Sequence, residues 1–225
     1  VQHNLPVSGL WNFDHPDEIK KTYSDLASLA AESHPDLIVF PLYDVPEDPL
    51  RNPAFFSALA QKMNTPILLA AHIPKTPDGS ILEEGYLSVA VFYSKEGKIL
   101  GHHQSVQTAP SFGVLKEWTA NSYEMLESPW GKIGILLCYE DANPAIAKEA
   151  VKQGAKFLMA LSNPGHFSNT FLPHYHLIQD QLRAIESDLP LVRVSSNGYS
   201  AFINPRGRLL QKSHLNQEEI LAGEV

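Results

Sequence analysis

The chain has 225 residues, of which 44% are hydrophobic and 19% charged, a composition that suits one globular domain with a sizeable core. Its formal net charge of −8 at pH 7 and its dispersed basic residues argue against a nucleic-acid partner, because phosphate binding needs clustered Lys and Arg side chains. A single cysteine, Cys138, excludes a disulfide within the chain. No apolar run reaches the roughly 20 residues of a membrane-spanning helix.

Strand-like apolar stretches and helix-like amphipathic stretches alternate along the chain. Residues 1–4 have the pattern of a strand entered midway, which indicates a domain cut from a longer chain. Four stretches have the apolar spacing or the Asn-Pro start that is typical of helices: 16–30, 54–63, 145–153 and 170–186. Six stretches are short, apolar and often β-branched, as buried strands are: 37–40, 67–71, 87–93, 133–138, 157–161 and 191–194.

Turn sequences at 95–98, 130–131 and 204–207 indicate hairpins, and the basic residues around Arg206 and Arg208 would lie at the rim of the last one. Hairpins combined with alternating strands and helices predict an α/β fold of two sheets faced by helices. No composition shift marks an internal boundary, so residues 1–225 are predicted to form one domain.

The most informative stretch is Gly131–Glu140, with the sequence GKIGILLCYE. An apolar strand ends at Cys138, and a helix is predicted soon after it. Main-chain N–H groups at a helix start can lower the pKa of a thiol and bind an oxyanion, so the pattern indicates a nucleophile. The alternative is a buried cysteine that serves as a small apolar side chain.

Several motifs around this cysteine occur in a fixed order. The motifs are Val1–Pro6 followed by Trp11, Cys138-Tyr139-Glu140, Leu161–Phe167 (LSNPGHF), Leu182–Glu186 (LRAIE) and Val194–Gly207. With these motifs the sequence resembles the nitrilase superfamily of carbon-nitrogen hydrolases, and within it the extramembrane domain of bacterial apolipoprotein N-acyltransferases. The resemblance is colinear over essentially the whole chain.

The resemblance implies a four-layer α-β-β-α sandwich, a cysteine acyltransferase or amidase chemistry, and no cofactor or metal. It also implies an acyl, lipid or lipoprotein-type ligand near Trp11, Tyr139, Glu140 and His166, the last of which occupies the family's loop tryptophan position. The domain would face the periplasm or the outside of a bacterial membrane, attached through flanking segments; a cytoplasmic amidase is the alternative.

Two of the three catalytic positions of the superfamily are replaced in this chain. The Glu base follows an aromatic-Pro pair in the family, but Phe40-Pro41 is followed by Leu42. The lysine position falls on Ser105, between Gly101 and Pro110. The second glutamate of the acyltransferases falls on Val114.

These replacements remove the groups that would activate the thiol. A thiol with a pKa of about 8.5 is mostly protonated at neutral pH, so a base must take its proton, and a cation must stabilise the oxyanion. Without them we expect the pKa of Cys138 to stay near that ordinary value. His102 and His103, in the strand before Ser105, are candidate substitute bases by analogy with Cys–His enzymes.

Two helical pairs have competing interpretations. His174 and His176 form an H-x-H pair that is predicted to pack rather than to bind a metal, because a third ligand is not evident. Arg183 and Glu186 form either an exposed ion pair or a brace beneath the cysteine loop.

Two functions therefore remain open. In the first, the domain has lost the family's catalysis and acts as a binding or accessory domain. In the second, it is a working cysteine-dependent N-acyltransferase or amidase with a rebuilt triad. Loss of one acid-base group typically costs about 10²–10⁴ in rate, which favours the first.

Overall fold

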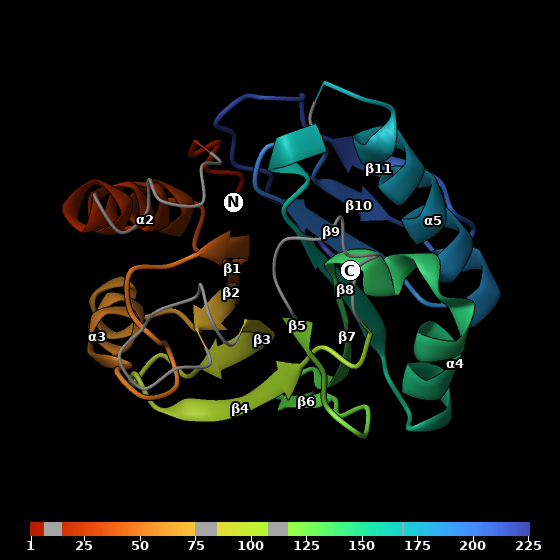
Figure 1. Cartoon of the computed structure of the whole chain (residues 1–225), viewed down its shortest axis with the longest axis horizontal. Coiled ribbons are helices and arrows are strands. Elements are labelled where there is room, and N and C mark those ends of the chain that lie inside the picture. The colour runs from red at the N-terminus through yellow and green to blue at the C-terminus, as the bar shows by residue number, and fades with distance from the viewer. Residues whose placement is uncertain (7–14, 75–84, 108–116, 168) are drawn as a thin grey trace.

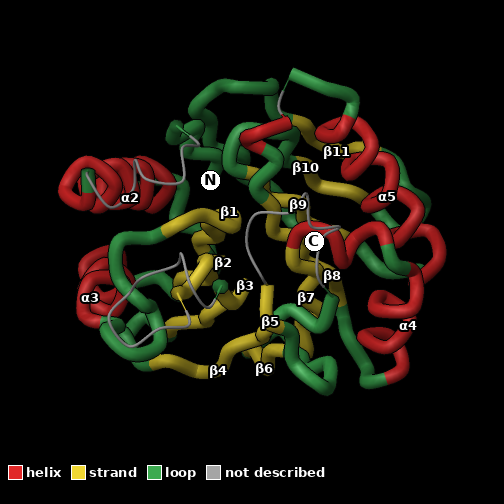
Figure 2. The backbone as a smooth tube through the Cα atoms, in the orientation of Figure 1, coloured by secondary structure: helices red, strands yellow, loops and turns green. Residues whose placement is uncertain are grey.

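The structure is a computed structural model that describes residues 1–6, 15–74, 85–107, 117–167 and 169–225. Two β-sheets lie face to face in the middle of the molecule, and helices cover their outer faces (Figures 1 and 2). The layers follow the order α-β-β-α, so the predicted α/β sandwich is confirmed.

The first sheet has the order β1-β2-β3-β4, and β5 pairs with β3. Its described strands are β1 (Ile38–Asp44), β2 (Ile67–Pro74), β3 (Tyr86–Tyr93), β4 (Ile99–Gln104) and β5 (Glu117–Trp118). β1 and β2 are parallel, whereas β2, β3 and β4 are antiparallel neighbours. On the outer face of this sheet lie α2 (Pro16–Ala31) and α3 (Ala54–Met63).

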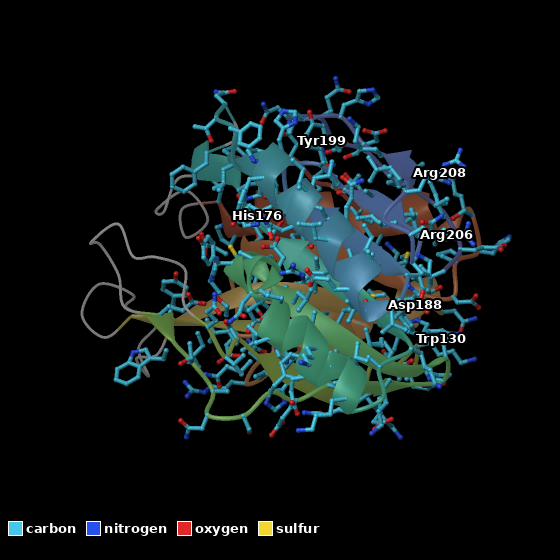
Figure 3. All side chains as sticks on the ribbon, turned by 90° about the vertical axis from the view of Figure 1, so that its right-hand side faces the viewer. Trp130, His176, Asp188, Tyr199, Arg206 and Arg208 are labelled. Carbon is cyan, nitrogen blue, oxygen red and sulfur yellow. The ribbon has the colours of Figure 1, made fainter. Side chains whose placement is uncertain are left out.

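The second sheet has the order β11-β10-β9-β8-β7-β6. Its described strands are β6 (Leu126–Ser128), β7 (Gly131–Leu137), β8 (Phe157–Ser162), β9 (Leu191–Ser195), β10 (Ala201–Ile203) and β11 (Leu209–Lys212). β7, β8 and β9 are parallel to one another. On its outer face lie α4 (Pro144–Lys152) and α5 (Leu172–Ser187), which are nearest the viewer in Figure 3.

Apolar residues fill the three spaces between the four layers. One cluster joins α2 and α3 to the first sheet, a second lies between the sheets, and a third joins α4 and α5 to the second sheet. The middle cluster contains Leu42 from β1 and Leu137 from β7, so the carboxyl ends of strands from both sheets meet there. This meeting point is where the candidate site lies.

The predicted helices and strands correspond closely to the observed ones, because their apolar periodicities match the faces that are buried. The start of the chain is an exception. Residues 1–4 were predicted to form a strand, but Gln2 makes only an isolated β-bridge with Glu219. Asn4 has a left-handed backbone with a φ of 48°, so the chain does not continue in an extended conformation at this residue.

No helix among the described residues has the length and apolar character needed to cross a membrane.

Gly134 in β7 allows the second sheet to approach α4 closely. A Cβ atom at this position would lie 2.6 Å from Leu158 Cδ2 and 2.8 Å from Ala150 Cβ. We predict that Gly134→Ala lowers the free energy of unfolding by about 1–3 kcal/mol, because the extra carbon overpacks this contact. Urea unfolding measures the loss. Gly101→Ala, where the nearest atom would lie at 3.4 Å, is the matched control, and equal losses in both variants would contradict the prediction.

Candidate active site

Cys138 lies where β7 ends and is the first residue of the short 3-10 helix η1 (Cys138–Ala142). Its backbone φ of 49° is left-handed, a conformation that costs residues other than glycine roughly 1–2 kcal/mol. Surrounding contacts must hold this turn. One of them is a hydrogen bond of 2.7 Å from the Leu137 N–H to Glu140 Oε2.

The thiol of Cys138 is held in its protonated form. Its pKa is raised to about 12, mainly by burial and then by the carboxylates of Asp141 and Glu117, while the cation of Arg193 opposes the shift. The sequence-based expectation of an ordinary pKa near ~8.5 is therefore wrong. The physical reason is burial of the thiol, to which the nearby carboxylates of Asp141 and Glu117 add.

Leu42 is the residue that the resemblance aligns with the family's base. Its side chain is fully buried in the apolar cluster between the sheets, and Cys138 packs against the same cluster. The register of β1 against β2 shifts between Phe40 and Leu42, so an irregularity precedes the position. Leu42 and Cys138 thus belong to the same apolar cluster between the sheets.

Ser105, at the lysine position, directly follows β4 and is almost fully buried. Its Oγ lies 2.8 Å from the Gln107 carbonyl oxygen and 3.3 Å from Glu140 Oε1. A longer side chain at position 105 would therefore reach the Glu140 carboxylate. The hydroxyl of Ser105 offers one proton and no charge.

Glu140 is fully buried and accepts hydrogen bonds from both sheets. Its Oε1 accepts from the Val106 N–H at 2.7 Å, and its Oε2 accepts from Leu137, as described above. His103 Nε2 lies 3.4 Å from Oε2. The carboxylate consequently connects the end of β4 to the end of β7, which supports a structural role in the cysteine turn.

A second buried network lies beneath η1. Asp141 Oδ2 accepts from His176 Nδ1 at 2.6 Å and from Arg193 Nη1 at 3.2 Å, and the same guanidinium donates to Asp180 Oδ2 at 2.6 Å. Burial raises the pKa of Asp180 to about 7, although Arg193 opposes the shift. Arg183 Nη1 donates to the Asp141 carbonyl oxygen at 3.2 Å.

The last contact bears on the two interpretations of the Arg183–Glu186 pair. Arg183 is buried, and besides Glu186 it contacts the backbone of η1, so it braces the cysteine turn. The two helix histidines do not act together: His176 contacts Asp141, whereas His174 lies against Phe171 and Tyr199. Among the described residues, no cluster of three or more His, Cys, Asp and Glu side chains is placed to hold a metal ion.

The two candidate substitute bases differ sharply in surroundings. His102 is exposed, whereas His103 is fully buried between Glu140 and the Glu124 carbonyl oxygen. Tyr139 is half-buried with its ring centroid 6.1 Å from that of His176. Trp11 and Val114 lie outside the described residues, as does the side chain of His166, and the ligand-binding roles of Trp11, Tyr139, Glu140 and His166 stay predictions.

Sequence reasoning missed a row of polar side chains at the strand ends of the first sheet. Asp44, His72 and Ser88 are register partners across β1, β2 and β3. Ser88 Oγ donates to Glu117 Oε1 at 2.6 Å and lies 3.1 Å from His72 Nδ1. The register of β2 against β3 places His72 beside Ser88, and a prediction of that register from the sequence would have grouped these side chains.

This polar row lies near the thiol. The Tyr86 ring centroid lies 4.8 Å from that of His72. Burial raises the pKa of Tyr86, and the charges of Glu117 and Cys138 add to the shift. The site therefore combines buried hydrocarbon at Leu42 with the polar side chains of Asp44, His72, Ser88 and Glu117, two of which are carboxylates.

A cavity of about 860 Å³ opens elsewhere, at the amino-terminal ends of β1 and β8. Its lining includes Val39, Phe157 and Met159 but not Cys138 or Leu42. The cavity is therefore separate from the cysteine turn, which lies at the carboxyl-terminal ends of the strands.

The chain belongs to the carbon-nitrogen hydrolase family, whose sequence profile matches residues 12–225. Within the family it is an apolipoprotein N-acyltransferase-like domain. It is 27% identical over 246 aligned residues to the apolipoprotein N-acyltransferase of Synechocystis sp. and 26% identical over 247 to that of Geobacter metallireducens. Each alignment covers 100% of this chain but 46% and 47% of the relative, so the chain spans about half the length of these proteins.

Solved structures share the fold at lower sequence identity. A carbon-nitrogen hydrolase from Helicobacter pylori G27 superposes with a TM-score of 0.74 at 20% identity, covering 91% of this chain and 82% of the other. A cysteine-to-alanine mutant of the Nesterenkonia AN1 amidase, from the nitrilase superfamily, gives 0.72 at 18% identity, with 95% and 84% covered. These likenesses confirm the nitrilase type of fold.

The pKa of Cys138 leads to a prediction about alkylation. The rate of reaction with iodoacetamide should be low at pH 7 and should rise about tenfold per pH unit through about pH 10, because the thiolate fraction keeps growing below a pKa of about 12. Intact mass measured against time gives the rate. The urea-unfolded chain is the control, and its alkylation rate should level off once the pH rises above the ordinary thiol pKa of about 8.5. A native rate that levels off below about pH 9 would contradict the raised pKa.

The network beneath η1 leads to a second prediction. Arg193→Met would leave Asp141 and Asp180 without their shared cation, and we expect it to lower the free energy of unfolding by about 3–5 kcal/mol. Urea unfolding at pH 7 measures the effect. Arg208→Met, at an exposed arginine of the β10–β11 hairpin (Figure 3), is the control and should change stability by less than about 0.5 kcal/mol. Similar losses in both variants would refute the assigned role of Arg193.

Proposed function

We propose that this domain has lost the acid-base chemistry of its family and acts as a non-catalytic binding or accessory domain. One observation carries the proposal: Leu42 is fully buried at the base position, in the apolar cluster against which Cys138 packs. Leucine cannot take a proton, and no rearrangement of its side chain would change that. The raised pKa of the thiol and the uncharged Ser105 support the same conclusion.

The proposed ligand is an acyl, lipid or lipoprotein-type group. The side chains of His72 and Glu117, which are part-exposed, would hydrogen-bond the head group of such a ligand. The similarity to proteins named apolipoprotein N-acyltransferase supports this class of ligand. A vesicle or detergent-micelle titration that leaves the fluorescence and the Cys138 alkylation rate unchanged would count against it.

The same similarity supports a location on the periplasmic or extracytoplasmic face of a bacterial membrane, attached through segments outside residues 1–225, rather than in the cytoplasm. Protease added to intact spheroplasts should then digest the domain. Digestion only after lysis would favour the cytoplasmic alternative.

A second candidate function is a working cysteine-dependent N-acyltransferase or amidase. The turn at Cys138 keeps its left-handed backbone, and His72 and Glu117 lie in the polar row near the thiol. A glutamate-to-leucine mutant of the Nesterenkonia AN1 amidase carries the acetamide moiety of fluoroacetamide on its active-site cysteine. A glutamate-to-leucine replacement in that amidase is thus compatible with a cysteine that reacts with fluoroacetamide. For the present domain, the alkylation rate of Cys138 in the folded chain must be compared with its rate in the unfolded chain.

Turnover by the unmodified domain distinguishes the two functions. We predict no Cys138-dependent hydrolysis or transfer with thioester and p-nitrophenyl ester substrates, because neither a base nor a lysine is in place. Product release measured for the parent and for Cys138→Ala should be equal. Robust turnover that Cys138→Ala abolishes would overturn the non-catalytic proposal, and His72→Gln and Glu117→Gln would then identify the rebuilt groups.

Restoring the missing residues provides the reciprocal test. Leu42→Glu alone buries an uncompensated charge and should lower stability by several kcal/mol, whereas Ser105→Lys alone brings its ammonium to the Glu140 carboxylate and should lower stability less. The double variant should lose less than the sum, because each residue supplies a counter-charge to the other. Intact mass after incubation with a thioester should then show an acyl adduct on Cys138. Losses that simply add would show that positions 42 and 105 do not face a common site.

A further inference from the structure

The ring of His103 is fully buried between β4 and η1, and each of its nitrogens faces an oxygen. Nδ1 lies 2.6 Å from the Glu124 carbonyl oxygen, and Nε2 lies 3.4 Å from Glu140 Oε2. The ring of Tyr123 packs edge-on at a centroid distance of 5.0 Å. The imidazole is therefore fixed by two polar contacts and one aromatic neighbour.

The two oxygens determine how many protons the ring carries. A main-chain carbonyl oxygen can only accept, so Nδ1 of His103 must donate to Glu124. An ionised carboxylate can also only accept, so Nε2 must donate to Glu140. A neutral imidazole has a single N–H, and both contacts are satisfied together only by the imidazolium form.

Glu140 is itself best satisfied as a carboxylate. Each of its oxygens accepts a main-chain N–H at 2.7 Å, from Val106 and from Leu137, and hydrogen bonds of this kind favour the charged form. A fully buried carboxylate needs a compensating positive charge. The Arg193 guanidinium is already shared by Asp141 and Asp180.

Ser105 does not supply that charge. Its single hydroxyl proton has a closer acceptor in the Gln107 carbonyl oxygen, at 2.8 Å, than in Glu140, at 3.3 Å. Because Ser105 nevertheless touches Glu140, a lysine at this position would bring its ammonium to the same carboxylate. The charge lost with that lysine must come from elsewhere.

We propose that His103, as a buried imidazolium, supplies the positive charge that is missing at position 105 and thereby holds the Cys138 turn through Glu140. His103 is a positioning residue: it contacts the carboxylate that accepts the Leu137 N–H, and Leu137 is the residue before the cysteine. The proposal holds whether or not Cys138 turns over a substrate.

The protonation of His103 tests the proposal directly in the unmodified protein. Two-dimensional ¹⁵N–¹H spectra of the imidazole groups at pH 7 should show both ring nitrogens of His103 protonated, with His103→Gln identifying the signal. His102, its exposed neighbour in the same strand, provides the internal reference signal. A neutral His103 ring with its proton on Nδ1 alone would overturn the proposal, because the ring would then carry no charge and Nε2 could only accept a hydrogen bond from a protonated Glu140.

A mutant cycle tests the link to position 105. His103→Gln should lower the melting temperature by about 5 °C or more, whereas His102→Gln should leave it unchanged. In a Ser105→Lys background, the loss caused by His103→Gln should shrink markedly, because the ammonium takes over the charge on Glu140. An undiminished loss would show that His103 acts through packing alone. If His103→Gln does not fold, Ser105→Lys with His103→Gln should recover a folded protein, and failure to recover it would also contradict the proposal.

Discussion

A single buried carboxylate, Glu140, joins the two sheets at the place where the candidate site lies. It accepts main-chain N–H groups from Val106, just beyond β4, and from Leu137, at the end of β7. A charge in this position must be neutralised inside the protein, so the side chains around it cannot vary independently. The shape of the cysteine turn, the burial of Ser105 and the contacts of His103 all follow from that requirement.

This constraint explains how the turn is held. The described hydrogen bonds that support its backbone do not come from Leu42 or Ser105. One supporting contact is the hydrogen bond from the Leu137 N–H to Glu140. Others come from the ion pair of Asp141 with Arg193 and from Arg183, which donates to the Asp141 carbonyl oxygen. Architecture and chemistry are therefore separable in this site, because different residues maintain them.

The sequence allowed the layers of the fold and the family to be predicted, since apolar periodicity and colinear motifs depend on neighbours along the chain. Other properties of the site depend on residues that are distant in sequence. The row formed by His72, Ser88 and Glu117 requires the register of β2, β3 and β5, and the last of these is two residues long. The shifted pKa of the thiol depends on burial and on the charges around it. A lone motif around Cys138 contains neither piece of information.

The left-handed backbone at Cys138 also restricts which residues can replace the cysteine. Once a residue no longer performs chemistry, selection on its side chain relaxes, but selection on the φ of 49° does not. β-branched and bulky residues are penalised there, and only glycine and short polar residues such as Asn and Asp adopt this conformation readily. The backbone conformation at Cys138 therefore favours glycine, Asn or Asp over cysteine, so the presence of a cysteine there is not explained by the conformation of the turn.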